Sequence, residues 1–237
     1  AWRIPRSAMA RLRVAEVFES VQGEGIWAGV PSVFVRVSGC NLRCSWCDTP
    51  YASWAPEGPV LEVPEVVRRV LDSALRHVVV TGGEPMLFPG VAELCAALRR
   101  EGRVVTIETA GTVWLDAECD LMSVSPKLSN SRPEGRWSAM HDARRRNLPV
   151  LRRLALERPC QWKFVVAPPY ERDLAEIDAL LAALGVPEPG PILLMPEGTD
   201  AETLARRSRD LVPICMARGW RLGSRLQIDL FGNQRGT

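Results

Sequence analysis

Three cysteines, Cys40, Cys44 and Cys47, stand within eight residues in the stretch VSGCNLRCSWCDTP. Clustered cysteines in a reducing compartment are more often metal ligands or catalysts than disulfide partners. A nucleophilic cysteine needs a neighbouring base, and the chain has only two histidines, His77 and His141. Residue type and spacing together therefore indicate a metal site.

Zinc and an iron–sulfur cluster are the two metal centres that fit this pattern. A structural zinc takes four ligands, and the fourth thiolate would come from Cys95, Cys119, Cys160 or Cys215, which stand in apolar contexts typical of small core residues. A 4Fe–4S cluster also normally takes four thiolates, so three cysteines would leave one iron open to an outside ligand. An open position suits chemistry, and a closed one suits structure. Incidental thiols, a nucleophile, and a disulfide that leaves one cysteine over are further alternatives.

The elements that would position this site alternate between strand-like and helix-like segments. Expected strands cover residues 13–21, 32–39, 77–83, 104–111, 119–127, 161–169, 191–198 and 224–232. Expected helices cover residues 63–76, 89–102, 171–185 and 201–219, and a loop and a helix are expected over 129–158. This alternation predicts an α/β protein with a mostly parallel sheet or partial barrel. In such folds the site lies beyond the carboxyl ends of the strands, where the sequence has Gly39, 81–83, Glu108, 125–127 and 195–197.

Composition limits the class of protein. The chain has 237 residues, of which 46% are hydrophobic and 24% charged, and its net charge is +2. These values predict one globular domain over residues 13–237, after an N-terminal extension over residues 1–12. The mild charge argues against a nucleic-acid partner, and no apolar run approaches the ~18 residues of a membrane span. We therefore expect a cytoplasmic protein, and the arginines at 144–146 are interpreted as a solvated helix face.

The pattern C-x3-C-x2-C, with Trp46 before its third cysteine, resembles the cluster motif of the radical S-adenosylmethionine superfamily. The stretch TGGEP at 81–85 resembles the glycine-rich motif of that superfamily and likewise follows a strand. The resemblance implies a reduced partial (β/α) barrel that holds a 4Fe–4S cluster on the three cysteines. It also implies that S-adenosylmethionine binds the open iron and yields a 5′-deoxyadenosyl radical, which takes a hydrogen from the substrate. Gly82 and Gly83 would let the backbone approach the methionine amino group without an intervening Cβ.

Longer stretches are similar to the 7-carboxy-7-deazaguanine synthases. These stretches are ESVQGEGIWAGVPSVFVRVSGCNLRCSWCDTPYA (19–52), TGGEPM (81–86), ETAGT (108–112), VSPK (124–127) and GNQRGT (232–237). The similarity implies a lyase of queuosine and 7-deazapurine biosynthesis. Such an enzyme converts 6-carboxy-5,6,7,8-tetrahydropterin to 7-carboxy-7-deazaguanine, with ring contraction and loss of ammonia. The similarity further implies a homodimer that uses Mg²⁺ and receives electrons from a donor such as flavodoxin.

The same similarity assigns roles to single residues. Contacts with S-adenosylmethionine would come from Trp46, Asp48, Gly83, Ser125, Pro126, Lys127, Met195, Pro196 and Glu197. Contacts with the pterin would come from Val21, Gln22, Gly23, Glu24, Arg36 and Thr81. Arg36 would pair with the substrate carboxylate, and Thr49 would ligate Mg²⁺ through its hydroxyl. Glu108, the candidate catalytic residue, would lie near S-adenosylmethionine or the substrate.

For three positions the sequence leaves the role of the side chain open. Arg36 alternates with Val35 and Val37, so its side chain would equally well face solvent. Lys163 would either point into the site or lie on the surface at a strand edge. Gln227 stands where some relatives carry a histidine, which leaves open the contribution of residues 225–237 to the pterin pocket.

Two other functions fit the three cysteines. An activase that makes a glycyl radical on another protein shares the cysteine pattern, but QGEG at 22–25 and the tail GNQRGT suit a small pterin pocket rather than an open docking face. A non-enzymatic module would hold zinc, or a cluster indifferent to S-adenosylmethionine. Metal analysis separates such a module from the enzymes.

Overall fold

The computed structural model describes residues 10–237, and its strands join into one sheet. The strands are β1 (Arg11–Val21), β2 (Pro31–Val37), β3 (Val60–Glu62), β4 (His77–Gly82), β5 (Val104–Thr109), β6 (Leu121–Val124), β7 (Cys160–Val166), β8 (Ile192–Pro196) and β9 (Arg221–Leu222). Their order across the sheet is β3-β1-β2-β4-β5-β6-β7-β8-β9. All neighbours from β2 to β9 run parallel, whereas β1 is antiparallel to β2 and β3. The predicted α/β fold with a mostly parallel sheet is confirmed.

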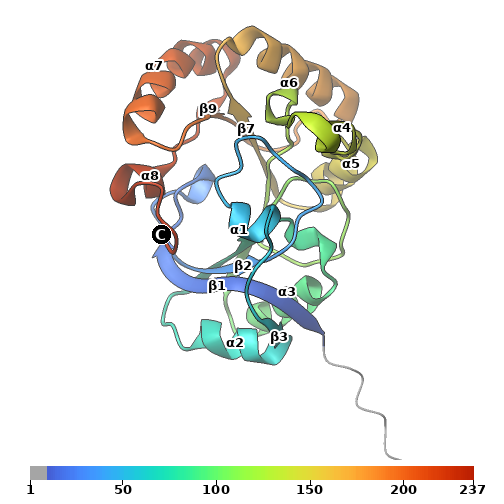
Figure 1. The fold of residues 1–237 in the computed structure, drawn as a ribbon, viewed down its shortest axis with the longest axis vertical. Helices are drawn as coiled ribbons and strands as arrows, with labels where there is room; N and C mark the ends of the chain where they lie inside the picture. Colours follow the sequence, from blue (N-terminus) through green and yellow to red (C-terminus); the bar gives the residue numbers. More distant parts are fainter. Residues whose placement is uncertain (1–9) are drawn as a thin grey trace, which may run out of the picture.

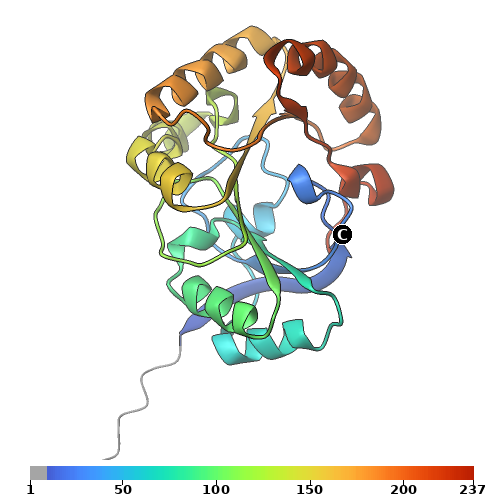
Figure 2. The ribbon, with the colours of Figure 1, turned by 180° about the vertical axis from the view of Figure 1, so that it is seen from behind.

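The helices are α1 (Pro50–Ser53), α2 (Val63–Leu71), α3 (Gly90–Arg100), α4 (Ser138–Arg145), α5 (Leu148–Glu157), α6 (Tyr170–Leu184), α7 (Ala201–Arg218) and α8 (Leu226–Phe231). Helices α2, α3, α5, α6 and α7 lie on the outside of the curved sheet, whereas the short helix α1 lies over the barrel interior (Figures 1 and 2). Short 3-10 helices occur at Gly25–Trp27, Pro85–Leu87, Ser129–Ser131 and Gly135–Trp137. The sheet curls into a partial barrel that is open on one side, and the segment before the C-terminus lies beside β1. Loops and polar side chains are therefore left to fill the barrel interior.

Local sequence explains where the long helices begin and end. Asp200 precedes α7, and its carboxylate accepts a hydrogen bond of 2.8 Å from the backbone N–H of Thr203. Helices α6 and α7 are each followed by a glycine in the left-handed conformation, Gly185 and Gly219, which ends the helical turn without a Cβ clash.

Side chains alternate between the outer and inner faces of the sheet. In β7, Trp162 is fully buried and packs in the main hydrophobic core beneath the helices. Its neighbour Lys163 therefore points to the inner face, where it lines a cavity. The same alternation on β2, β4 and β5 brings Arg36, Thr81 and Glu108 to that cavity. The inner face of the sheet thus carries polar side chains beside Phe34, Val165 and Met195, whereas its outer face is apolar.

Two of the predicted boundaries are wrong. Residues 224–232 were expected to form a strand, but they contain helix α8, because the sheet edge beside β8 is already taken by β9. The predicted extension over residues 1–12 is too long, because β1 begins at Arg11 and Leu12 is buried against the core in register with Leu61 of β3. The sequence of the short strand β3 shows no clear hydrophobic periodicity, so this strand was not predicted. Residues 1–9 lie outside the described part of the chain.

None of the helices described in residues 10–237 is long and apolar enough to cross a membrane.

Candidate active site

The three cysteines lie on the loop that follows β2, and all of them line one cavity of about 250 Å³ in the barrel interior. The Sγ of Cys40 accepts a hydrogen bond of 3.3 Å from the backbone N–H of Leu42, and the Sγ of Cys47 lies 3.0 Å from the hydroxyl of Ser53. Burial raises the pKa of the Cys40 thiol to about 11 and that of the Cys44 thiol to about 12. Thiols buried in this way become thiolates when a cation replaces the proton, as a metal centre does.

The cysteine loop is held in place by the segment between β6 and α5. The Nδ1 of buried His141 accepts a hydrogen bond of 3.1 Å from the backbone N–H of Arg43. Its Nε2 lies 3.0 Å from the hydroxyl of Ser131. Burial lowers the pKa of His141, so the ring is neutral and carries its proton on Nε2. The backbone carbonyl of Ser131 also accepts a 2.9 Å hydrogen bond from the N–H of Ser45. His141 therefore supports the loop backbone and is not a base for a cysteine nucleophile.

Gly82 and Gly83 permit close contact between backbones. A Cβ on Gly82 would lie 2.0 Å from the carbonyl oxygen of Val37, and a Cβ on Gly83 would lie 2.2 Å from that of Gly39. Gly82 also has a φ of +137°, which disfavours any L side chain. These contacts join the end of β4 to β2 and to the base of the cysteine loop. These contacts give the glycine pair a structural role, and both glycines also line the cavity. The expected approach of the methionine amino group to this backbone stays a prediction.

The acidic residue of the same TGGEP motif, Glu84, is fully buried. Its carboxylate accepts hydrogen bonds from the hydroxyl of Thr109 (2.7 Å), the backbone N–H of Ala110 (2.8 Å) and the backbone N–H of Met86 (3.1 Å). Burial raises the pKa of this carboxyl. Glu84 therefore ties the loop after β4 to the end of β5.

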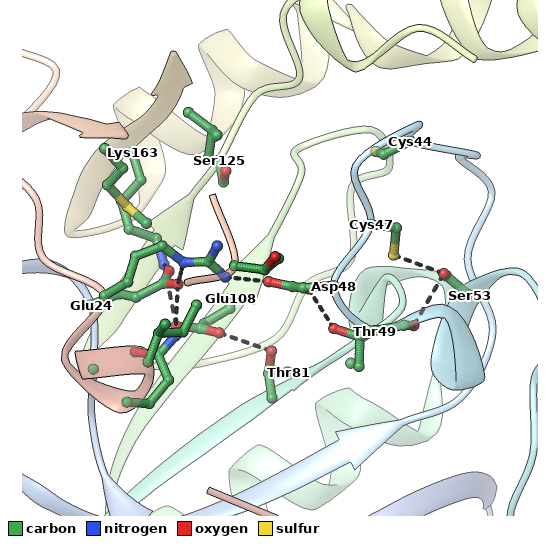
Figure 3. Close-up of a pocket in the computed structure, with 18 of the residues that line it drawn as sticks. Glu24, Cys44, Cys47, Asp48, Thr49, Ser53, Thr81, Glu108, Ser125 and Lys163 are labelled. Atoms are coloured by element: carbon green, nitrogen blue, oxygen red, sulfur yellow. Dashed lines mark hydrogen bonds and ion pairs between the residues drawn. The ribbon is translucent and has the colours of Figure 1, made fainter. Parts of the chain in front are cut away.

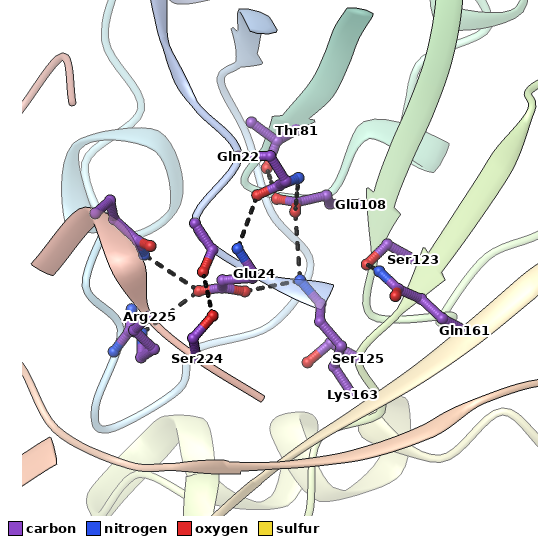
Figure 4. A network of polar contacts seen from close by, with 12 residues as sticks. Gln22, Glu24, Thr81, Glu108, Ser123, Ser125, Gln161, Lys163, Ser224 and Arg225 are labelled. Carbon is purple, nitrogen blue, oxygen red and sulfur yellow. Dashed lines mark hydrogen bonds and ion pairs between the residues drawn. The ribbon is translucent and has the colours of Figure 1, made fainter. Parts of the chain in front are cut away.

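An ion-pair network crosses the barrel interior (Figure 4). The Nζ of Lys163 lies 2.7 Å from Glu24 Oε2 and 3.3 Å from Glu108 Oε1, and its side chain is only 3% exposed. Glu108 also accepts hydrogen bonds from Gln22 Nε2 (3.2 Å) and Thr81 Oγ1 (2.8 Å). The interpretation of Lys163 as a surface lysine is therefore wrong.

Opposite charges keep Lys163 and Glu24 ionised. Burial lowers the pKa of Lys163, but the carboxylates of Glu108 and Glu24 outweigh burial and hold that pKa above its ordinary value. Burial raises the pKa of Glu24, but Lys163 and Arg225 outweigh burial and lower that pKa to about 2. The interior thus presents fixed charges and aligned hydrogen-bond groups at neutral pH.

The segment around α8 completes the cavity wall. Arg225 forms two ion pairs. Its Nε lies 3.4 Å from Glu24 Oε1, and its Nη2 pairs with the carboxylate of Asp48. Gln227 Nε2 donates a 3.3 Å hydrogen bond to Glu24, and the hydroxyl of Thr49 donates one of 2.7 Å to Asp48. Figure 3 shows Asp48 between the cysteines at one end of the cavity and Glu24 at the other. Arg225 therefore connects the two ends, and the segment that the sequence left open does contribute to the site.

The residues expected to contact S-adenosylmethionine lie on the cysteine loop, on the loops after β4 and β6, and at the carboxyl end of β8 and just beyond it. The Nζ of Lys127 donates to Ser125 Oγ at 2.7 Å and lies 5.7 Å from the ring centroid of Trp46. Met195 and Glu197 line the same cavity at the end of β8.

Arg36 faces the cavity, so the interpretation that it faces solvent is wrong. Its Nε donates a 2.6 Å hydrogen bond to Glu16 Oε1, and its guanidinium lies 5.6 Å from the ring centroid of Phe18. One donor of the guanidinium is thereby used, and among residues 10–237 the terminal nitrogens donate to no partner.

Nearly all residues predicted from sequence line the one cavity. The exceptions are Pro126 and Pro196, which are buried and stand outside its lining. Sequence reasoning missed Arg225 and Ser123, and it left Lys163 and Gln227 undecided; all four line the cavity. The cysteines with a core role, Cys95, Cys119, Cys160 and Cys215, are buried as predicted.

Similarity to known proteins identifies the family. Residues 34–155 match the radical SAM superfamily. The 7-carboxy-7-deazaguanine synthase of Rhodopirellula baltica is 44% identical to the chain over 237 residues, which cover 98% of this chain and 91% of that protein. The chain belongs to the 7-carboxy-7-deazaguanine synthase family. A synthase from Halobacterium salinarum is 41% identical over 94% of this chain and 91% of that protein.

A solved structure supports the same family. QueE from Escherichia coli matches with a TM-score of 0.69 and 27% identity, covering 90% of this chain and 93% of that one. The enzyme is therefore a radical SAM lyase of the synthase family, as predicted, and its cofactors are a 4Fe–4S cluster and S-adenosylmethionine. Neither the activase nor the interaction module is favoured.

The geometry of the cysteines fits a cluster better than a single ion. In residues 10–237 no three His, Cys, Asp or Glu side chains come close enough together to hold one metal ion, yet the three thiols line one cavity. In a 4Fe–4S cluster each thiolate binds a different iron, so the sulfur atoms stand apart around the cluster. None of the other four cysteines lines the cavity, so within the described residues no cysteine is placed to give zinc a fourth thiolate ligand.

Proposed function

We propose that the cavity binds 6-carboxy-5,6,7,8-tetrahydropterin and that the enzyme contracts its ring to 7-carboxy-7-deazaguanine with release of ammonia. The observation that carries this proposal is the buried polar network of Gln22, Glu24, Glu108 and Lys163, which shares one cavity with the three cysteines. A pterin edge carries amine and amide-like groups, and the carboxylates and the Gln22 amide are complementary to them. Membership of the synthase family agrees with this substrate.

The chain's own residues bind and orient the substrate. Val21, Gln22, Gly23, Glu24 and Thr81 are proposed to contact the pterin. The free terminal nitrogens of Arg36 are proposed to bind the substrate carboxylate, since a guanidinium fits a carboxylate bidentately. Glu108, fixed by Thr81, Gln22 and Lys163, is the proposed catalytic residue, because its carboxyl oxygens can exchange a proton at the pterin edge.

The cofactors are proposed to bind at the opposite end of the cavity. The thiolates of Cys40, Cys44 and Cys47 would hold the cluster. The residues proposed to contact S-adenosylmethionine are Trp46, Asp48, Gly83, Ser125, Pro126, Lys127, Met195, Pro196 and Glu197. When bound, these cofactors supply hydrogen-atom abstraction by radical chemistry. Side chains of the surrounding loops line that end of the cavity.

Magnesium is proposed to bind at Thr49. The hydroxyl of Thr49 donates its proton to Asp48, so its lone pairs are free for a cation. Oxygen ligands from the substrate carboxylate and waters would complete an octahedral shell.

Domain organisation, oligomeric state, electron donor and location are further parts of the proposal. One sheet joins strands from β1 to β9, which favours a single domain. The exposed apolar side chains Val212, Met216 and Leu222 lie on α7 and on edge strand β9, and favour a homodimer through that edge. A flavodoxin-like donor would supply the electron. The need to keep the ligand thiols reduced favours a cytoplasmic location.

A product assay tests the proposed function. Protein reconstituted anaerobically with iron and sulfide is reduced with dithionite and given S-adenosylmethionine, Mg²⁺ and 6-carboxytetrahydropterin. Mass spectrometry is expected to detect 7-carboxy-7-deazaguanine. Formation of 5′-deoxyadenosine without that product would show that the substrate is wrong.

A further inference from the structure

A β-bulge in β1 turns one acidic side chain toward the barrel interior. Leu12 and Val14 belong to the hydrophobic core, and the register between β1 and β2 then shifts between Val14 and Glu16. Without the shift, Glu16 would face the core with Leu12 and Val14, because side chains two positions apart in a strand share a face. The bulge instead pairs Glu16 with Arg36 of β2, whose side chain lines the cavity. Bulges that re-aim a side chain in this way are enriched next to active sites.

The carboxylate of Glu16 joins side chains from three distant parts of the chain. Its Oε1 accepts hydrogen bonds from Arg36 Nε (2.6 Å) and from the hydroxyl of Tyr51 (2.7 Å). Its Oε2 lies 3.3 Å from Arg235 Nε. Burial raises the pKa of Glu16, but the hydrogen bonds from Tyr51 and Arg36 outweigh burial and hold that pKa below its ordinary value. Two guanidinium groups therefore share one carboxylate anion at neutral pH.

The first of these guanidinium groups is fixed in direction by Glu16. The carboxylate occupies the Nε donor of Arg36, which leaves the two terminal nitrogens for another anion. Phe18, the next inward residue of β1, lies with its ring centroid 5.6 Å from the guanidinium, and its ring stacks on that of Phe34 at 5.0 Å. Arg36 is thus held at one edge and over one face. Its free edge has the two parallel donors that a carboxylate accepts.

The second guanidinium group belongs to the C-terminal tail, defined as residues 232–237. Arg235 pairs with Glu16 and Glu57, and it lies 4.1 Å from the ring centroid of Tyr51. In the described chain, Arg235 makes every hydrogen bond between residues 233–237 and the residues before the tail. The tail residues that line the cavity are Gly232, Asn233, Gln234 and Thr237. Arg235 therefore holds one wall of the cavity in place.

We propose that Glu16 is a positioning residue, which aims Arg36 at the substrate carboxylate and holds the C-terminal tail in the cavity wall through Arg235. The inference rests on the proposed function, and it adds the group that orients the carboxylate-binding arginine. Glu16 is not among the residues that line the cavity, so it acts through the two arginines rather than on the substrate.

The experiment compares Glu16→Gln with Glu19→Gln. Both changes keep the size of the side chain and remove one negative charge from β1. Glu19 is exposed, and its carboxylate has no hydrogen-bond or ion-pair partner within residues 10–237. A third variant, Arg235→Gln, removes the contact with the tail and leaves the contact between Glu16 and Arg36.

Turnover of the reconstituted enzyme is measured first, at varied concentrations of 6-carboxytetrahydropterin. Glu16→Gln is expected to raise the KM about tenfold with kcat within about threefold of native, and Glu19→Gln is expected to behave like the native enzyme. The same change is then made in an Arg36→Met background. There it should raise the KM only about twofold further, because residues that act through one another are not additive.

The position of the tail is measured without turnover. Carboxypeptidase Y is added to the reconstituted enzyme, and mass spectrometry follows the release of Thr237. Release is expected to be about fivefold faster from Glu16→Gln and from Arg235→Gln than from the native enzyme, because a tail without its contacts opens more often. Glu19→Gln should release Thr237 at the native rate.

Three results would overturn the role of Glu16. One is an equal KM for the native enzyme and Glu16→Gln. Another is an equal rise in KM in the native and Arg36→Met backgrounds, which would mean that Glu16 only supports the fold. The third is equal release of Thr237 from the native enzyme and Glu16→Gln. A native enzyme that forms no 7-carboxy-7-deazaguanine would contradict the proposed function instead, and the release of Thr237 would still decide whether Glu16 holds the tail.

Discussion

Replacement of Lys163 by methionine is expected to destabilise the protein in a pH-dependent way. Lys163 is the cation shared by Glu24 and Glu108 in the barrel interior. The pKa of Glu24 is lowered from 4.5 to about 2, and each pKa unit corresponds to about 1.4 kcal/mol. Removing the nearer of the two cations around Glu24 should therefore lower the free energy of unfolding by about 3 kcal/mol at pH 8. Other buried ion pairs that lose one partner destabilise their proteins by a similar amount.

The sign of the pH dependence follows from the carboxylates. In the native protein the Glu24 contribution is present above pH 4.5 and is lost only as the pH falls towards about 2. In Lys163→Met, Glu24 loses the nearer of its two cations, and burial, the largest influence on this carboxyl, then raises its pKa above that of the unfolded chain. The folded variant then takes up a proton as the pH falls from 8 to 5, which stabilises it. The difference in the free energy of unfolding between Lys163→Met and the native protein should therefore be larger at pH 8 than at pH 5.

Urea unfolding of the metal-free protein at both pH values, followed by circular dichroism, measures this difference. The double variant Glu24→Gln/Lys163→Met is the matched control, because it removes the Glu24 charge together with the cation. It should be more stable than Lys163→Met alone at pH 8. A Lys163→Met protein that unfolds like the native one at both pH values would refute the assigned role of the ion pair.

Further substitutions test the ends of the cavity. Cys44→Ala should abolish turnover and lower the iron content after reconstitution, while Cys215→Ala in the core should leave the iron content unchanged; equal iron in both variants would contradict the ligand assignment. Thr49→Ala should raise the Mg²⁺ concentration for half-maximal activity by about tenfold, and an unchanged magnesium titration would remove Thr49 as a ligand. Arg225→Met should raise the KM for the pterin by about tenfold with a smaller change in kcat, because Glu24 and Asp48 lose their link. A fall in kcat alone would mean that Arg225 acts on the chemical step.

Much of the site was predictable because its parts are local. The cysteine spacing and the polar residues at strand ends follow directly from the chain, and parallel strands bring their carboxyl ends together. The inward direction of Lys163 was also within reach, because Trp162 and Phe164 on either side belong to the core. A charged residue between two large apolar ones in a strand favours an inner, polar face over a surface edge.

Other features depend on contacts that sequence periodicity does not reveal. Arg225 lies 201 positions after Glu24, and nothing in the local pattern RLQID links the two. The same pattern alternates like a strand yet forms α8, since the sheet edge is filled by β9. The role of Gly82 was likewise hidden, because its neighbour, the carbonyl of Val37, belongs to another strand.

The separation of contacts along the chain also sets an order in which the two ends of the cavity can form. The cysteine loop is complete once residues up to Arg144 are present, because its supports come from Ser131, His141 and Arg144. The substrate end needs Arg225 and Gln227, which close loops of about 200 residues onto Glu24. Closing a longer loop costs more chain entropy and slows folding. During synthesis, the cluster-binding end can therefore be assembled while the substrate end is still open.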